Sequence, residues 1–100
     1  MSKKIDGVIE AARYKNGQLL VVRAYERRGF AFSDRVLLDR KTLLERLQKG
    51  GQYFTGTRQE LHASTFNIDK PVLIVNLEGR ELLATRETAT CDELEDVPVF

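Results

Sequence analysis

The sequence predicts a mainly β protein with a single helix, built as a small barrel or a strongly bent antiparallel sheet. Three observations indicate this class. An Asn-Gly pair at 16–17 separates two apolar runs, and a Glu-Gly pair at 78–79 separates two more. Between them, after Asp39, the hydrophobic period changes from that of a strand to that of a helix. The predicted order of elements is therefore β-β-β-α-β-β-β.

The Asn-Gly pair predicts a hairpin between residues 8–14 and 19–25, because both central positions of a tight type I′ turn need a positive φ. A two-residue loop places Glu10 opposite Arg23, and such a charge pair helps to fix the register. The other face of this hairpin is uniformly apolar and is expected to enter the core. It carries Ile9, Ala11, Leu20, Val22 and Ala24.

A third strand is expected over Phe30–Leu38, where apolar residues recur at alternate positions. Asp39 can then cap a helix, because its carboxylate can accept hydrogen bonds from the first N–H groups. The Gly-Gly pair at 50–51 ends that helix, since glycine takes the left-handed position after the last turn without strain. Its apolar face is formed by Leu43, Leu44 and Leu47.

The chain beyond the helix is expected to be extended again up to Thr85, and periodicity fails from Arg86 onward. The predicted strands are Tyr53–Arg58, a weaker Leu61–Ile68, Val72–Leu77 and Arg80–Thr85, with a break at Asp69-Lys70-Pro71. Residues 88–100 lack periodicity and are rich in acids. We therefore expect a single β-rich domain over 1–87 and a flexible acidic tail over 88–100.

This order of elements resembles that of the OB-fold, a small Greek-key barrel made of three strands, a helix and two strands. The resemblance is one of topology, and the additional C-terminal hairpin departs from it. An SH3-like barrel and an open sheet with one helix on its face are the alternatives.

The near-neutral total charge conceals a strong asymmetry. Residues 1–58 hold thirteen Lys and Arg against six Asp and Glu, which gives a charge of +7. Residues 59–100 hold three bases against nine acids, which gives −6. A basic body of this kind favours an anionic partner for that half of the chain, but the charge alone does not identify the partner.

The sequence offers little for catalysis or for a cofactor. Its one histidine, His62, and its one cysteine, Cys91, cannot build a metal site, and Ser64 near His62 is not accompanied by any nucleophile motif. The longest aliphatic runs, at 19–22 and 72–75, are too short to cross a bilayer. We expect a soluble, cytoplasmic, non-enzymatic protein without cofactor, metal or membrane partner.

Arginine and tyrosine alternate in the basic part, most densely between residues 23 and 35. Arginine pairs with phosphate, and aromatic rings stack on bases, so we favour a weak, sequence-tolerant binder of single-stranded nucleic acid. The candidate residues are Tyr14, Arg23, Tyr25, Arg27, Arg28, Arg35, Tyr53 and Arg58. The alternative is a protein–protein interaction module or small accessory subunit that uses the sheet edge at 53–58 or the acidic tail, with the aromatic residues serving as core.

Overall fold

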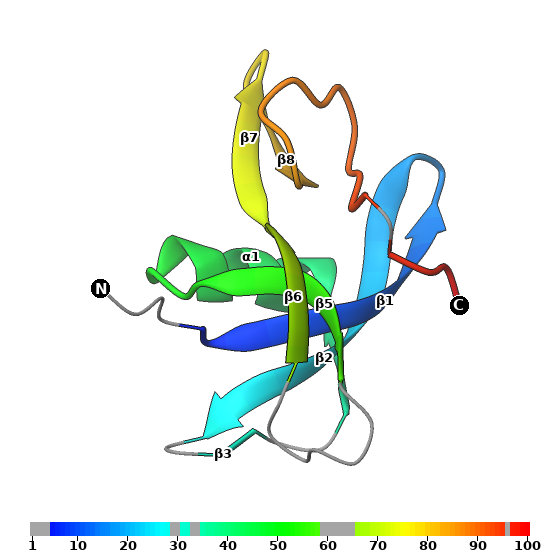
Figure 1. Cartoon of the computed structure of the whole chain (residues 1–100). Coiled ribbons are helices and arrows are strands. Elements are labelled where there is room, and N and C mark those ends of the chain that lie inside the picture. The colour runs from blue at the N-terminus through cyan, green and yellow to red at the C-terminus, as the bar shows by residue number, and fades with distance from the viewer. Residues whose placement is uncertain (1–4, 29–30, 33–34, 59–65, 96) are drawn as a thin grey trace.

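The computed structural model describes residues 5–28, 31–32, 35–58, 66–95 and 97–100, and the structural statements below concern these residues (Figure 1). They form a mainly β fold with one helix, as predicted. In chain order the elements are β1 (Gly7–Lys15), β2 (Gln18–Arg28), β3 (Ala31–Phe32), β4 (Val36–Asp39), α1 (Arg40–Gln48), β5 (Tyr53–Arg58), β6 (Phe66–Pro71), β7 (Leu73–Leu77) and β8 (Arg80–Ala84).

The strands form a main sheet and a separate ribbon. The main sheet has the order β3-β2-β1-β5-β6, and β4 also pairs with β2, next to β3 on the same edge. β1 and β5 run parallel, and the other neighbours run antiparallel. β7 and β8 form the ribbon. Among the described residues the main sheet does not close on itself, so neither the OB-like nor the SH3-like barrel is confirmed.

Both predicted hairpin turns are present. Asn16 and Gly17 have φ values of 53° and 77°, and Glu78 and Gly79 have values of 50° and 81°. Positive φ at both central residues is the condition for the type I′ loop, whose twist matches that of the flanking strands. The turn chemistry therefore fixes where β1 meets β2 and where β7 meets β8.

The register between β1 and β2 differs from the prediction in its middle. It shifts between Ile9 and Ala11 and again near the turn, so that Ala11 rather than Glu10 lies opposite Arg23. An extra residue on one strand reverses the side on which the following side chains point. Ala12 therefore enters the core, whereas Leu20, which we expected there, is 46% exposed.

The predicted helix is confirmed, with Asp39 as its N-cap. The Asp39 carboxylate accepts a hydrogen bond from the Thr42 N–H at 2.8 Å, and this bond lowers the pKa of Asp39. The helix ends where Gly50 takes a φ of 90° and the Gly51 N–H donates to the Arg46 carbonyl at 2.9 Å. No helix in the described ranges is long and apolar enough to cross a membrane.

The extended regions on either side of the helix differ in detail from the predicted strands. The single strand expected over 30–38 is described as two, β3 and β4, and residues 33–34 between them lie outside the described part. The expected break at 69–71 is wrong, because β6 continues to Pro71. Proline is tolerated there because β6 is the last strand of the sheet, where one row of N–H groups has no ladder partner.

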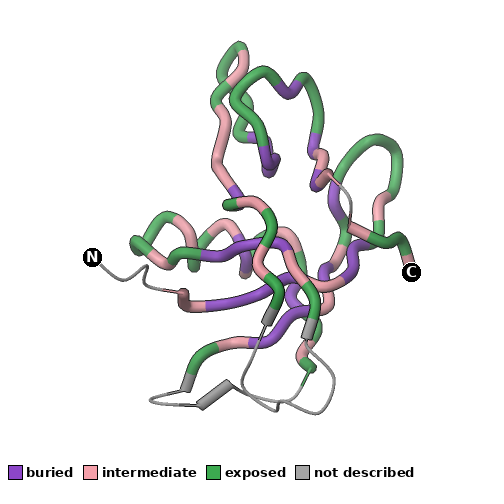
Figure 2. The backbone as a smooth tube through the Cα atoms, viewed as in Figure 1, coloured by how far each residue is buried: buried purple, intermediate pink, exposed green. Residues whose placement is uncertain are grey.

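The core joins the main sheet, the helix and the ribbon (Figure 2). Val36, Leu47 and Ile74 are only partly buried, but they pack against this core. The buried residues of this cluster are Ile9, Ala12, Leu19, Val22, Ala24, Leu38, Leu43, Tyr53, Val72, Leu83 and Leu94.

The end of the chain packs on the body. We call residues 88–95 and 97–100 the C-terminal segment. Ala89 and Leu94 are 3% and 4% exposed. The Ala12 N–H donates to the Pro98 carbonyl at 2.9 Å, and the Phe100 N–H donates to the Ala12 carbonyl at 3.0 Å. The structure thus differs from the flexible tail that we expected over 88–100.

Candidate functional site

Arginines gather on the side of β1, β2 and β4 that faces away from the core residues Ala12, Val22 and Leu38. Ala11 lies opposite Arg23, and Arg23 lies opposite Leu37. Opposed side chains of an antiparallel pair point to the same side of the sheet, and Arg13 follows Ala11 by two residues. We call this surface the arginine face. It comprises Arg13, Arg23, Arg35, Leu37 and Phe100.

Phe100 brings an aromatic ring to the arginine face. The guanidinium carbons of Arg13 and Arg23 lie 4.7 and 4.5 Å from the centre of that ring. The Nε of Arg13 also donates to the main-chain oxygen of Phe100 at 2.9 Å. These cation–π contacts place an aromatic ring beside two cations, the combination that the sequence had suggested for the tyrosines.

Tyr25 lies beneath this face and is only 1% exposed. Its hydroxyl donates to the Glu10 carboxylate at 3.2 Å and accepts from the Nε of Arg35 at 2.9 Å. The same Nε lies 2.8 Å from Glu10, and the Arg35 side chain is still 61% exposed. Tyr25 therefore offers no open ring for stacking in this structure. Instead, it holds Arg35 at the surface, and the pKa of Arg35 is raised by Tyr25 and Glu10.

Tyr53 and Arg27 lie away from the arginine face, at a polar pocket of about 380 Å³ beside the end of α1. Tyr53 is 3% exposed, and its hydroxyl donates to Glu26, whose carboxylate also lies 3.1 Å from the Nε of Arg46. Burial and the Glu26 charge raise the pKa of Tyr53. Arg27 is exposed at the pocket and donates through Nε to the Ile5 carbonyl at 2.6 Å.

The remaining candidate residues are Tyr14, Arg28 and Arg58. Tyr14 is half-buried against the core, and its hydroxyl accepts a hydrogen bond from the Leu94 N–H at 3.0 Å. Burial is the main cause that raises the pKa of Tyr14. Arg28 and Arg58 lie in strands, but their side chains lie outside the described part, as do His62 and Ser64 altogether. The structure thus brings together Arg23, Tyr25 and Arg35, and it separates Arg27 and Tyr53 from them.

A second charged site lies at Asp92 of the C-terminal segment, whose side chain is only 1% exposed. Its carboxylate accepts hydrogen bonds from the N–H groups of Leu19 (2.8 Å) and Leu83 (3.0 Å). It also pairs with the Nε of Arg40 at 2.8 Å. Burial tends to raise the pKa of Asp92, but the bonds from Arg40, Leu83 and Leu19 outweigh burial and lower it. We call this arrangement the Asp92 clamp.

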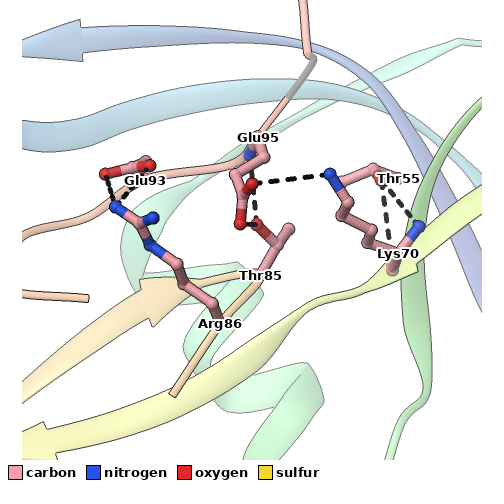
Figure 3. A network of polar contacts seen from close by, with 6 residues as sticks. All are labelled: Thr55, Lys70, Thr85, Arg86, Glu93 and Glu95. Atoms are coloured by element: carbon pink, nitrogen blue, oxygen red, sulfur yellow. Dashed lines mark hydrogen bonds and ion pairs between the residues drawn. The ribbon is translucent and has the colours of Figure 1, made fainter. Parts of the chain in front are cut away.

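The neighbouring acids are also paired within the chain (Figure 3). Glu93 lies 3.1 Å from Arg86, and Glu95 lies 3.5 Å from Lys70. The Thr85 hydroxyl and the Glu95 carboxylate are 3.2 Å apart. Much of the acidity at the end of the chain is therefore used to attach that end to the body.

Sequence reasoning missed Arg13, Asp92 and Phe100. Arg13 could have been found, because alternation places it on the side of Ala11. Nothing local marks Asp92 or Phe100, since their partners lie far away in the sequence. Within the described ranges, His, Cys, Asp and Glu side chains form no group of three that could hold a metal ion. Comparison with protein-family models, curated proteins and solved structures gave no match.

Proposed function

We propose that this chain is a non-enzymatic binding module whose arginine face binds single-stranded nucleic acid. One observation carries the proposal: Arg13, Arg23 and Arg35 share one side of the sheet with the ring of Phe100. A cytoplasmic location, inferred from the single cysteine, belongs to the same proposal.

The chemistry of this face suits a nucleic-acid backbone with unpaired bases. Guanidinium groups form forked, charge-assisted hydrogen bonds with phosphate oxygens. An aromatic ring stacks on any base, because every base has a π-face, so the binding should tolerate most sequences. The affinity should be modest, because Glu10 compensates the charge of Arg35 and two of the arginines already contact Phe100.

A fluorescence anisotropy titration tests the proposal, with labelled single-stranded oligonucleotides of mixed sequence at low salt. Replacing Arg23 and Arg35 together by Ala should weaken binding to all sequences alike. It should also flatten the dependence of log affinity on log salt by about 1.4, as expected for two lost contacts to a single strand.

The matched control removes two positive charges elsewhere, by Lys41→Ala in α1 and Arg80→Ala in β8. The control should change affinity less than the double variant of the face. Equal losses in both would show that only total charge matters. No binding at tens of micromolar protein would overturn the proposal.

A protein partner is the second candidate, and exposed apolar side chains favour it. Leu37 on the arginine face is 64% exposed, and Val99 next to Phe100 is 70% exposed. Apolar side chains of this kind at a rim of arginines are common in protein interfaces. A partner that binds here should do so with a discrete stoichiometry and with little dependence on salt, in contrast to an oligonucleotide.

A further inference from the structure

The two outer edges of the β7–β8 ribbon differ in their backbone hydrogen bonding. On the β8 side, the Leu83 N–H donates to Asp92, and the Glu93 N–H donates to the Leu83 carbonyl at 2.9 Å. The Thr85 N–H continues this edge by donating to the Glu93 carbonyl at 3.2 Å. On the β7 side, no strand or bridge pairs with the ribbon among the described residues. Figure 1 shows the ribbon projecting from the main sheet, with β8 between β7 and the C-terminal segment.

The turn determines which groups of β7 point to this open edge. Leu77 and Arg80 flank a two-residue loop, so they exchange both backbone hydrogen bonds. Alternation then directs the N–H and C=O groups of Ile74 and Asn76 away from β8. Leu83 confirms this alternation. It lies opposite Ile74, and its backbone N–H and C=O groups point away from β7 and bond to Asp92 and Glu93.

The composition of β7 leaves the edge without the usual protection. Its sequence, Leu-Ile-Val-Asn-Leu, contains no charge and no proline, and its pairing with β8 shows no bulge. Natural edge strands are normally protected against pairing by one of these devices. The two strands of the ribbon thus differ, since the Asp92 clamp covers only the β8 edge.

We propose that β7 is a self-association edge and that its partner is β7 of a second copy of this chain, paired antiparallel. The spacing is self-complementary: with Val75 on the two-fold axis, Ile74 of each copy lies opposite Asn76 of the other. Each such pair exchanges two hydrogen bonds, so four bonds form. The half-buried Leu73, Val75 and Leu77 lie on one face of the strand and then meet their counterparts.

The two-fold register permits a sharp test by disulfide cross-linking, carried out with Cys91→Ser to remove the exposed native thiol. Val75 faces its own copy in a pair without hydrogen bonds, where the Cα atoms lie about 4.5 Å apart, within disulfide range. The matched control is Asn76→Cys, since diagonal neighbours lie about 7–8 Å apart, beyond that range. Mild oxidation should cross-link Val75→Cys at least about five-fold more than the control.

Sedimentation velocity of the unmodified chain supplies a measurement that does not depend on any variant. The sedimentation coefficient should rise with concentration over roughly 10 to 300 μM, since so small a contact gives a weak dimer. Val75→Lys, which places two like charges on the axis, should abolish the rise. A monomer at every concentration would overturn the proposal, and so would equal cross-linking at positions 75 and 76.

Discussion

The Asp92 clamp and the arginine face use the same chemistry for different ends. In the clamp, a carboxylate that is 1% exposed pairs with Arg40 and also accepts two backbone N–H groups. On the arginine face, Arg35 pairs with Glu10 while its own side chain is 61% exposed. Both contain a carboxylate paired with an arginine, but the arginine side chain is 26% exposed in the clamp and 61% exposed on the arginine face.

This difference in burial assigns the two regions different roles. Removing a buried carboxylate leaves its arginine and N–H partners desolvated and without an acceptor, so the removal is costly. An exposed pair contributes little to stability because water and salt screen it. The clamp should therefore hold the fold together, and the arginine face should leave its cations available to a ligand.

The largest effect is expected from deleting residues 88–100. The deletion removes the buried Ala89, Asp92 and Leu94 and opens the edge of β8. We expect the cooperative unfolding transition in urea, followed by circular dichroism, to be lost or to shift to a much lower urea concentration. A truncated chain that unfolds like the full chain would show that the clamp does not hold the fold.

The next effect is expected from Asp92→Ala, which leaves Arg40 and two N–H groups without their acceptor. The free energy of unfolding should fall by about 3–5 kcal/mol. Glu93→Ala is the matched control, because the Glu93–Arg86 pair is exposed and should contribute less than about 1 kcal/mol. Equal losses in the two variants would contradict the comparison between buried and exposed pairs.

The stability of the clamp should also depend on pH. The pKa of Asp92 is lowered from 3.8 in the folded chain, so the unfolded chain binds the proton first as the pH falls. The stabilisation is thus complete above the ordinary value of 3.8 and is lost as the pH falls through the lower folded value. The difference in unfolding free energy between the native chain and Asp92→Asn should narrow below this value in acid urea titrations, and a constant difference would contradict this origin.

A smaller effect is expected on the arginine face from Phe100→Ala. Loss of the ring should weaken oligonucleotide binding by about 1 kcal/mol or somewhat more, the lower range for stacking of one base. Phe100→Tyr keeps an aromatic ring and should bind like the native chain in the same anisotropy titration. Unchanged affinity of Phe100→Ala would remove the ring from the proposed binding surface.

The sequence predicts those features that depend on a few neighbouring residues, and it does not predict those that depend on residues far apart in the chain. The turns at 16–17 and 78–79 and the helix that begins after Asp39 depend on backbone conformations that a few neighbouring residues impose, and they are present. The Asp92 clamp depends on Leu19, which is 73 residues away, so no local pattern could reveal it.

The tyrosines show the same limit for the candidate site. An aromatic residue on a strand serves equally well as core or as a stacking surface, and only its neighbours decide between the two. Tyr53 is buried because Gly7 leaves room for its ring: a Cβ at Gly7 would lie 2.3 Å from that ring. The basic pattern made Arg23 and Arg35 candidates without placing them, whereas the ring that contacts Arg23 is that of Phe100.

The most direct test compares Arg40→Ala with Arg23→Ala, by measuring for each variant both the unfolding free energy in urea and the affinity for one labelled oligonucleotide. Arg40 belongs to the clamp and Arg23 to the arginine face. We predict that Arg40→Ala lowers stability and leaves the affinity of the folded chain unchanged, and that Arg23→Ala lowers affinity with a stability change below about 1 kcal/mol. Losses of stability and affinity in the same proportion in both variants would contradict the separate roles of the clamp and the arginine face.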